Sequence, residues 1–255
     1  MTEEREQWKN KYLEEHPKLL EKWREKGLAY TERENGCWGT FVSDGIHDPD
    51  KWFNQEIRPL FILKEGFGAW VDWSEIEYFI TGRTKKGTIK SKTWRCIEDW
   101  AAYIMTNKEW HWTESGLRSE ENQRILHGIE KPFIKQIATL NIKKYGGLPY
   151  ASDADLKKHA ENHFEEIYRQ IELIKPTIII CGYTGWLLDI VWEKKFGKPI
   201  REERNDAWVY SVPNLMPEVR MLDYWHSFLT CRTSNGEHRR ILDRFKKEFM
   251  QRKSG

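Results

Sequence analysis

Residues 58–73 read RPLFILKEGFGAWVDW, an apolar run that leads directly into a lysine, a glutamate and two glycines. Residues 59–64 predict a buried strand, because the run is short, apolar and followed by turn-forming residues. Gly66 and Gly68 let the chain bend sharply and let a ligand approach the backbone closely. Glu65 is therefore expected in a loop just after the strand, either as a site residue or as an ordinary solvated acid.

Further apolar runs predict the other strands of the same sheet. Apolar residues also recur at helical spacing over residues 153–174, behind Asp153 as the expected N-cap. Strands that alternate with helices favour a parallel sheet. The expected fold class is therefore α/β, a single domain with a central, mostly parallel sheet flanked by helices. The additional predicted strands cover residues 136–141, 177–181, 208–212 and 219–223.

Both ends of the chain are predicted to be helical. Residues 3–27 are rich in Glu, Lys, Leu and Trp, and Pro17 is expected to interrupt their helix, since proline cannot continue a helix from the interior. Residues 236–253 have the pattern of an amphipathic helix. We expect an N-terminal helical cap over residues 1–30 and one α/β domain over residues 31–255.

Composition and charge argue against several classes of protein. The formal net charge of the 255 residues is +2, which is too small to indicate nucleic-acid binding by itself. No apolar run is long enough to span a membrane and the N-terminus has no apolar signal core, so the expected location is the cytoplasm. The four cysteines are far apart and form no C-x-x-C pair, which predicts reduced thiols and no metal site. We expect a monomer without a metal or organic cofactor.

Polar residues follow three of the predicted strands. Glu65 follows the first, Asn141 ends the second, and His226 comes just after the last. In an open parallel sheet, ligands bind beyond the carboxyl ends of the strands, so these side chains are expected to converge on one edge. Each has an ordinary alternative, since asparagine often caps a turn and a single histidine between aromatic residues is often structural. Only the set indicates a functional site.

A basic segment follows the first predicted strand. Residues 81–95 contain six Lys or Arg and no acid, with glycine, threonine and serine interleaved. Such a composition suits contacts with phosphates, and the alternative is a solvated basic loop. The residues expected to contact DNA are Arg83, Lys85, Lys86, Lys90 and Lys92.

The sequence TIIICGYTGWLLDIV, residues 177–191, invites comparison with dinucleotide-binding turns. It fits poorly, because Leu188 stands where a third glycine is expected and no G-x-G occurs. Gly182 and Gly185 are instead expected to form a tight turn between a strand and a helix. A G-x-S-x-G nucleophile elbow, typical of serine hydrolases, is also absent from the sequence.

Four segments, taken in order, make the chain resemble the uracil-DNA glycosylase superfamily. KEGFGAWVD, residues 64–72, is similar to the G-E-A-P-G motif of one branch, with Glu65, Gly68 and Asp72 in matching positions. ATLNIKK, residues 138–144, is similar to the second strand ending in asparagine, with Lys143 two places on. The last two are KPTIIICGYTG, residues 175–185, which resembles the third strand and its turn, and WHSFLTCR, residues 225–232, which resembles the H-P-S-P-L-S motif with one proline missing.

The resemblance implies a DNA glycosylase that flips a uracil or modified pyrimidine out of double- or single-stranded DNA and hydrolyses its bond to deoxyribose. Glu65, or Asp72 in its place, would orient a water and stabilise positive charge on the sugar, while His226 would hydrogen-bond the departing base. Asn141 would read the edge of the base. The other implied substrate contacts are Phe67, Gly68, Trp70, Lys143 and Ser227, and the implied DNA contacts include Phe228, Leu229 and Arg232.

Other functions stay open. The missing proline beside His226 favours a non-catalytic DNA-binding module of the same fold. An enzyme that acts on free nucleosides would have no need of the basic segment. Some bacterial members of the superfamily remove modified cytosines from phage DNA, so the resemblance allows an antiviral role as well as DNA repair.

Overall fold

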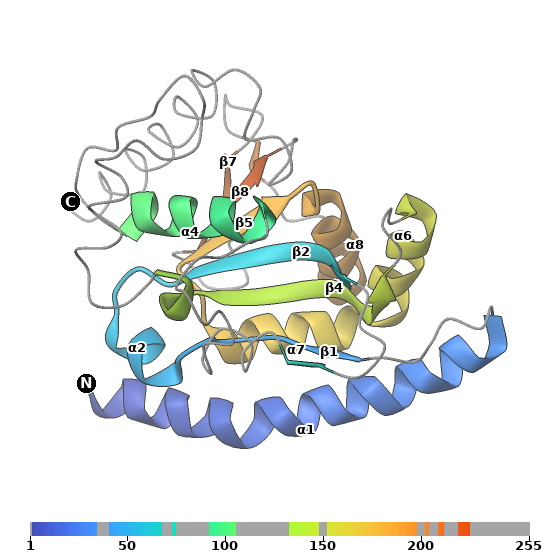
Figure 1. Cartoon of the computed structure of the whole chain (residues 1–255), viewed down its shortest axis with the longest axis horizontal. Coiled ribbons are helices and arrows are strands. Elements are labelled where there is room, and N and C mark those ends of the chain that lie inside the picture. Colours follow the sequence, from blue (N-terminus) through green and yellow to red (C-terminus); the bar gives the residue numbers. More distant parts are fainter. Residues whose placement is uncertain are drawn as a thin grey trace.

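The computed structural model of the chain describes residues 2–34, 41–67, 73–74, 92–105, 133–147, 152–197, 202–203, 209–211 and 219–224. In this part of the chain, four parallel strands are flanked by helices, which makes the fold α/β (Figure 1). The predicted fold class is confirmed at this level.

The central sheet is built from strands that the apolar runs predicted. Among the described residues its strand order is β4-β2-β5-β8-β7-β6. The strands β4, β2, β5 and β8 are mutually parallel, whereas β7 runs antiparallel to both β8 and β6. The carboxyl ends of the four parallel strands therefore lie at one edge of the sheet. The bounds are β2 (Pro59–Phe67), β4 (Ala138–Gly147), β5 (Ile178–Gly182), β6 (Glu202–Glu203), β7 (Val209–Ser211) and β8 (Arg220–Tyr224).

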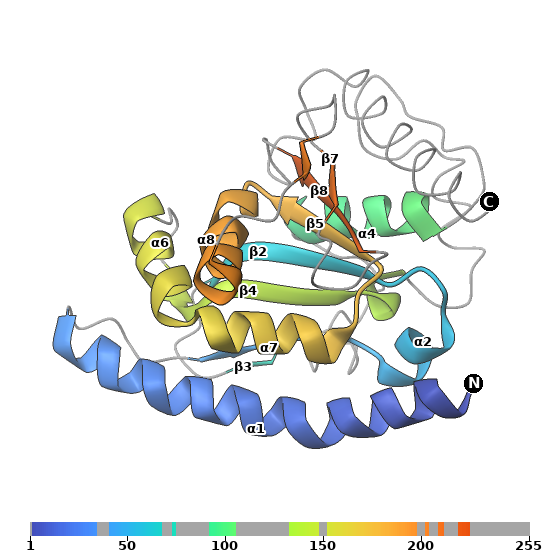
Figure 2. The ribbon, with the colours of Figure 1, turned by 180° about the vertical axis from the view of Figure 1, so that it is seen from behind.

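Helices cover both faces of this sheet. Successive residues of a strand point to opposite faces, so Leu60 and Ile62 enter one core and Phe61 enters the other. The core that contains Leu60 lies toward α7 and α8, and the core that contains Phe61 lies toward α4 and the 3-10 turn η1 (Figures 1 and 2). These elements are α4 (Lys92–Met105), η1 (Phe133–Gln136), α7 (Phe164–Ile174) and α8 (Gly185–Phe196).

The N-terminal helix α1 (Glu3–Glu34) is continuous, which corrects the predicted interruption at Pro17. Proline at this position removes the bond to the carbonyl of Leu13, but Leu13 is 49% exposed, so water can hydrate that carbonyl. Tyr12 and Trp23 are buried in the same core as the sheet. The helix lies along α7 in both views (Figures 1 and 2), and this packing outweighs the lost hydrogen bond.

The single helix predicted over residues 153–174 is in fact two helices, α6 (Asp153–Asn162) and α7. They meet at His163, which has φ −119° and ψ 22° and therefore leaves the helical region. The two helices have different partners, because α6 packs against β4 and α8 whereas α7 also packs against α1. The N-cap prediction is corrected too, since Ser152 takes that position, without a side-chain hydrogen bond, and Asp153 begins the helix.

Both β2 and β4 continue past their predicted ends. Glu65 pairs with Lys143 and Phe67 pairs with Gly147, so Glu65 lies inside a strand and not in the loop expected after it, and Asn141 lies within β4 and does not end it. Between these two pairs β2 advances two residues and β4 advances four, which is a local irregularity of register. The added parts of the two strands contain charged residues, which the sheet accommodates because Glu65 and Lys143 form a cross-strand ion pair.

The remaining described elements are short. β1 (Val42–Ser43) pairs in parallel with β3 (Trp73–Ser74). The helix α2 (Pro49–Asn54) begins after Asp48, whose carboxylate accepts a hydrogen bond from the Lys51 N–H. Within the described ranges, no helix is both long and apolar enough to cross a membrane. The helix predicted over residues 236–253 lies outside the described residues.

Gly27 allows α1 to approach β4 closely, so a larger residue at this position should destabilise the fold. A Cβ atom at Gly27 would lie 1.8 Å from Cζ of Tyr145, whose hydroxyl donates to the Trp23 carbonyl at 2.7 Å. Gly27→Ala should gain about 1 kcal/mol of helix propensity, yet overpacking at a buried ring typically costs about 1–3 kcal/mol, and so short a contact favours the larger figure. We expect lower stability in urea unfolding.

The matched control for this prediction is Lys22→Ala on the exposed side of α1, which should change stability by no more than about 0.5 kcal/mol. A Gly27→Ala protein that is more stable than the wild type would contradict the proposed close packing, because helix propensity alone predicts that gain.

Candidate functional site

Charged side chains gather at the carboxyl edge of the sheet. The ammonium Nζ of Lys143 lies 3.2 Å from Oε2 of Glu65 and 2.6 Å from Oδ2 of Asp155. Nearby, Nζ of Lys64 lies 3.6 Å from Oδ1 of Asp153. We call this set the edge cluster: Lys64 and Glu65 of β2, Lys143 of β4, and Asp153 and Asp155 of α6.

The pair at the centre of the edge cluster is largely buried. The side chains of Glu65 and Lys143 are 8% and 11% exposed, whereas Asp155 is 38% exposed. Lys143 donates a hydrogen bond to Asp155. Its contact with Glu65 is an ion pair without hydrogen-bond geometry, and Oε2 of Glu65 accepts no hydrogen bond from another described residue. This oxygen is thus a buried acceptor without a donor among the described residues.

Burial and charge act on these two groups in opposite ways. Burial raises the pKa of Glu65, and the nearby charge of Lys143 only partly offsets it. For Lys143 burial acts against the ammonium, but the hydrogen bond to Asp155 and the charge of Glu65 outweigh it, so its pKa is raised. Lys143 is consequently a cation at neutral pH. The carboxyl group of Glu65 that it faces loses its proton less readily than a solvated acid does.

The turn after β5 lies at the same edge. Tyr183 has a positive φ of 59°, which is uncommon for a bulky residue, and Nζ of Lys64 lies 4.4 Å from its ring centroid. The Gly185 N–H donates to Oδ1 of Asp223 at 3.2 Å, and a Cβ at Gly185 would lie 2.0 Å from Oδ2 of that carboxylate. Asp223 thus occupies the start of α8, where a dinucleotide phosphate would bind, in agreement with the poor sequence match.

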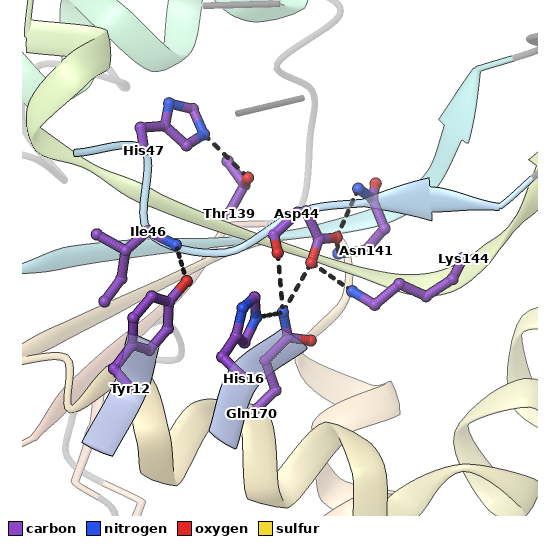
Figure 3. A network of polar contacts seen from close by, with 9 residues as sticks. All are labelled: Tyr12, His16, Asp44, Ile46, His47, Thr139, Asn141, Lys144 and Gln170. Atoms are coloured by element: carbon purple, nitrogen blue, oxygen red, sulfur yellow. Dashed lines mark hydrogen bonds and ion pairs between the residues drawn. The ribbon is translucent and has the colours of Figure 1, made fainter. Parts of the chain in front are cut away.

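A second polar cluster is buried beside β4, where residues 41–47 run along the outer edge of this strand (Figure 3). The Thr139 N–H donates to the carbonyl of Gly45 at 3.0 Å. At Asn141 the carboxylate of Asp44 replaces a backbone acceptor: its Oδ2 accepts from the Asn141 backbone N–H at 2.6 Å and from the side-chain amide at 2.9 Å. Asp44 therefore completes the hydrogen bonding of a strand edge.

The same carboxylate is neutralised by a buried lysine. Oδ1 of Asp44 lies 2.5 Å from Nζ of Lys144, and both side chains are 0% exposed. Oδ1 also accepts from Nε2 of Gln170 at 2.8 Å, and this nitrogen lies 3.0 Å from Nε2 of His16. Burial lowers the pKa of His16 to about 3, so the ring is neutral and accepts that bond. We call Asp44, Asn141, Lys144, Gln170 and His16 the Asp44 network (Figure 3).

The structure brings some of the predicted site residues together. Glu65 and Lys143 are in contact at the carboxyl edge, as expected of neighbouring strand ends. Asn141 is fully buried, and its amide nitrogen donates to Asp44. Phe67 and Lys92 lie in β2 and α4, but their side chains are not described. The predictions for Gly68, Trp70, Asp72, Arg83, Lys85, Lys86, Lys90, His226, Ser227, Phe228, Leu229 and Arg232 fall outside the described residues.

Sequence reasoning missed Asp44, Lys144 and Asp155. Asp44 lies in a Gly- and Asp-rich stretch without a helix or strand pattern, and Asp155 lies in a helix that appeared simply amphipathic. One signal was available for Lys144. It follows Leu140 and Ile142 at alternate positions of the strand, so the alternation would have placed it on a buried face, where a lysine requires an anionic partner.

The described residues contain no group of three or more His, Cys, Asp or Glu side chains arranged to hold a metal ion. What the edge cluster offers instead is a shielded carboxylate with an adjacent fixed cation. The carboxylate of such a pair can stabilise developing positive charge and orient a water, while the cation holds the carboxylate in place. No protein-family model matches the chain, and no curated protein matches it.

The Asp44 network predicts strong coupling between Asp44 and Lys144. Asp44→Asn keeps the shape but leaves a buried lysine charge without its anion, and Lys144→Met leaves the carboxylate without its cation, so each should cost about 3–5 kcal/mol of stability. The double variant should lose clearly less than the sum of the two. Urea unfolding of the four proteins measures the coupling, and strictly additive losses would show that the two groups do not form a pair.

The buried histidines predict a loss of stability in mild acid. Burial lowers the pKa of His16 to about 3 and that of His47 and of His159 to about 4, from an ordinary 6.5. Below pH 6.5 the unfolded chain binds protons that the folded chain excludes, so stability falls as the pH falls. At pH 5 each histidine should account for about 2 kcal/mol. His16→Leu should flatten the dependence measured by urea unfolding from pH 7 to 5, and an unchanged slope would argue against a neutral, buried His16.

Proposed function

We propose that the chain is a monofunctional DNA glycosylase of the uracil-DNA glycosylase superfamily, which excises uracil or a modified pyrimidine and leaves an abasic site. One observation supports this most: each of the four segments that carry the resemblance overlaps or directly follows one of the four parallel strands. Residues 64–72 begin in β2, residues 138–144 lie in β4, residues 175–185 contain β5, and residues 225–232 directly follow β8. The carboxyl ends of these four strands lie at one edge of the sheet, which is where a ligand binds in an open parallel sheet, and this supports the proposal.

The environment of Glu65 supports its proposed role as the carboxylate that faces the sugar. Cleavage of the bond between base and sugar places positive charge on the sugar and negative charge on the departing base. An anion in a shielded position stabilises the former more strongly than an anion in water, because the local dielectric is lower. His226 would stabilise the departing base, and its place two residues after the end of β8 fits this proposal.

The charge of Lys143 supports hydrolysis over a lyase reaction. A lyase needs an uncharged amine to attack the sugar and form a Schiff base. Lys143 lies between two carboxylates that raise its pKa, so its nitrogen holds a proton and lacks a free electron pair. Water activated beside Glu65 is then the proposed nucleophile. The proposed setting is the cytoplasm, and the proposed role is either DNA repair or removal of modified bases from phage DNA.

The function is tested by base release from oligonucleotides that carry uracil or modified pyrimidines, and from phage DNA, with released bases identified by mass spectrometry. Single-turnover rates should fall on the order of a hundredfold or more in Glu65→Gln. The matched control is Glu161→Gln, which makes the same acid-to-amide change on α6 outside the edge cluster and should stay close to the wild-type rate. Borohydride should trap no covalent complex.

The outcomes separate the alternatives. DNA binding without release of any base would support the non-catalytic DNA-binding module in place of the enzyme. Release from free nucleosides alone would support a nucleoside-processing enzyme. Base release by Glu65→Gln at the wild-type rate would remove Glu65 from the mechanism and make Asp72 the candidate carboxylate.

A further inference from the structure

Lys143 connects the proposed catalytic carboxylate to helix α6. We propose that Lys143 is a positioning residue: its ammonium holds the carboxylate of Glu65 at the edge of the sheet, and Asp155 of α6 holds Lys143 in turn. This inference rests on the proposed function, because it assigns to Lys143 the placement of the group that would face the sugar.

The backbone already brings the two residues together. Glu65 and Lys143 are direct partners in the parallel pairing of β2 with β4, so both side chains leave the same face of the sheet. The ion pair of 3.2 Å is therefore formed between two rigid strands, which fix it better than loops would. On the far side of the ammonium, Oδ2 of Asp155 lies 2.6 Å away and comes from the first turn of α6.

Burial argues for positioning and against a grip on DNA phosphates. The Lys143 side chain is only 11% exposed, and two carboxylates already compensate its charge. A lysine that binds phosphate gains affinity by releasing counterions from DNA, and a lysine neutralised within the protein has little such gain. The resemblance placed Lys143 among the substrate contacts, and the structure places its ammonium between Glu65 and Asp155.

The charges around Glu65 give this inference a directional test. The described groups that face it are Lys64 on its own strand, Lys143 on β4 and Asp155 on α6. Two further titratable groups act on these, because Asp153 pairs with Lys64, and Nε2 of His159 lies 3.6 Å from Asp155. Lys143 lowers the pKa of Glu65 and Asp155 raises it. Removal of the Lys143 charge and removal of the Asp155 charge must therefore shift the pKa of Glu65 in opposite directions.

The first experiment needs no catalytic activity. The side-chain carboxyl of Glu65 is titrated by carbon NMR in the wild type, Lys143→Met, Lys143→Arg and Asp155→Asn, with the Glu65→Gln protein to assign the signal. The pKa of Glu65 should rise in Lys143→Met, stay near its wild-type value in Lys143→Arg, and fall in Asp155→Asn. Asp155 is partly exposed, so its variant tests the arrangement even if Lys143→Met does not fold.

The second experiment follows single-turnover base release against pH. Lys143→Met should slow release on the order of a hundredfold, the penalty typical of a misplaced reacting group. The rate rises with pH as Glu65 ionises, so the acid limb should move to higher pH in Lys143→Met and to lower pH in Asp155→Asn. Lys143→Arg should recover most of the rate, and DNA affinity should be unchanged in all three.

Two results would overturn this inference and leave the proposed function standing. One is an active wild type in which Lys143→Met leaves both the Glu65 titration and the acid limb unchanged. The other is a Lys143→Met protein with an unchanged rate but weaker, less salt-dependent DNA binding, which would make Lys143 a phosphate contact. If the wild type releases no base while the titration shifts occur as expected, the proposed function fails and the ion-pair arrangement stands.

Discussion

The placement of β4 depends on the hydrogen bonds and the ion pair that the buried carboxylate of Asp44 makes. It accepts hydrogen bonds from the backbone and the side chain of Asn141 and from Gln170 of α7, and it pairs with Lys144 inside the core. The removal of two charges from water costs several kcal/mol, and such a pair is tolerated only when its hydrogen bonds are nearly complete. The pair therefore allows little freedom in how residues 41–47, β4 and α7 pack together.

The two clusters are connected by the alternation of a single strand. Consecutive residues of β4 point to opposite faces, so Lys144 enters the Asp44 network while Lys143 points to the edge cluster. A slip of β4 by one residue would bring Ile142 or Tyr145 to one of the two lysine positions and leave a buried carboxylate without its partner. The contacts that secure Lys144 thus also determine that Lys143 lies opposite Glu65. The Asp44–Lys144 ion pair thus fixes the register of β4, and this register places the Glu65–Lys143 pair that is proposed to serve the reaction.

Much of the fold was predictable from local pattern, and the polar contacts were not. Short apolar runs predicted the parallel strands because burial on both faces leaves a continuous apolar signal. The ends of β2 and β4 were predicted too early, because Glu65 and Lys143 interrupt that signal and are accommodated by their ion pair across the two strands and by Asp155 of α6. The continuity of α1 at Pro17 and the break at His163 depend on packing between elements, and the Asp44 pair joins residues 100 positions apart.

We propose that Glu65, held by Lys143 at the carboxyl edge of β2, faces the sugar of a flipped nucleotide. The most direct test is a structure of the chain bound to DNA whose target nucleotide carries the released base and a 2′-fluorine, which slows cleavage by disfavouring positive charge on the sugar. We expect an extrahelical base at this edge, with the Glu65 carboxylate within about 3.5 Å of the sugar or of a water positioned beside it. A nucleotide that stays stacked in the DNA, or that binds away from Glu65, would contradict it.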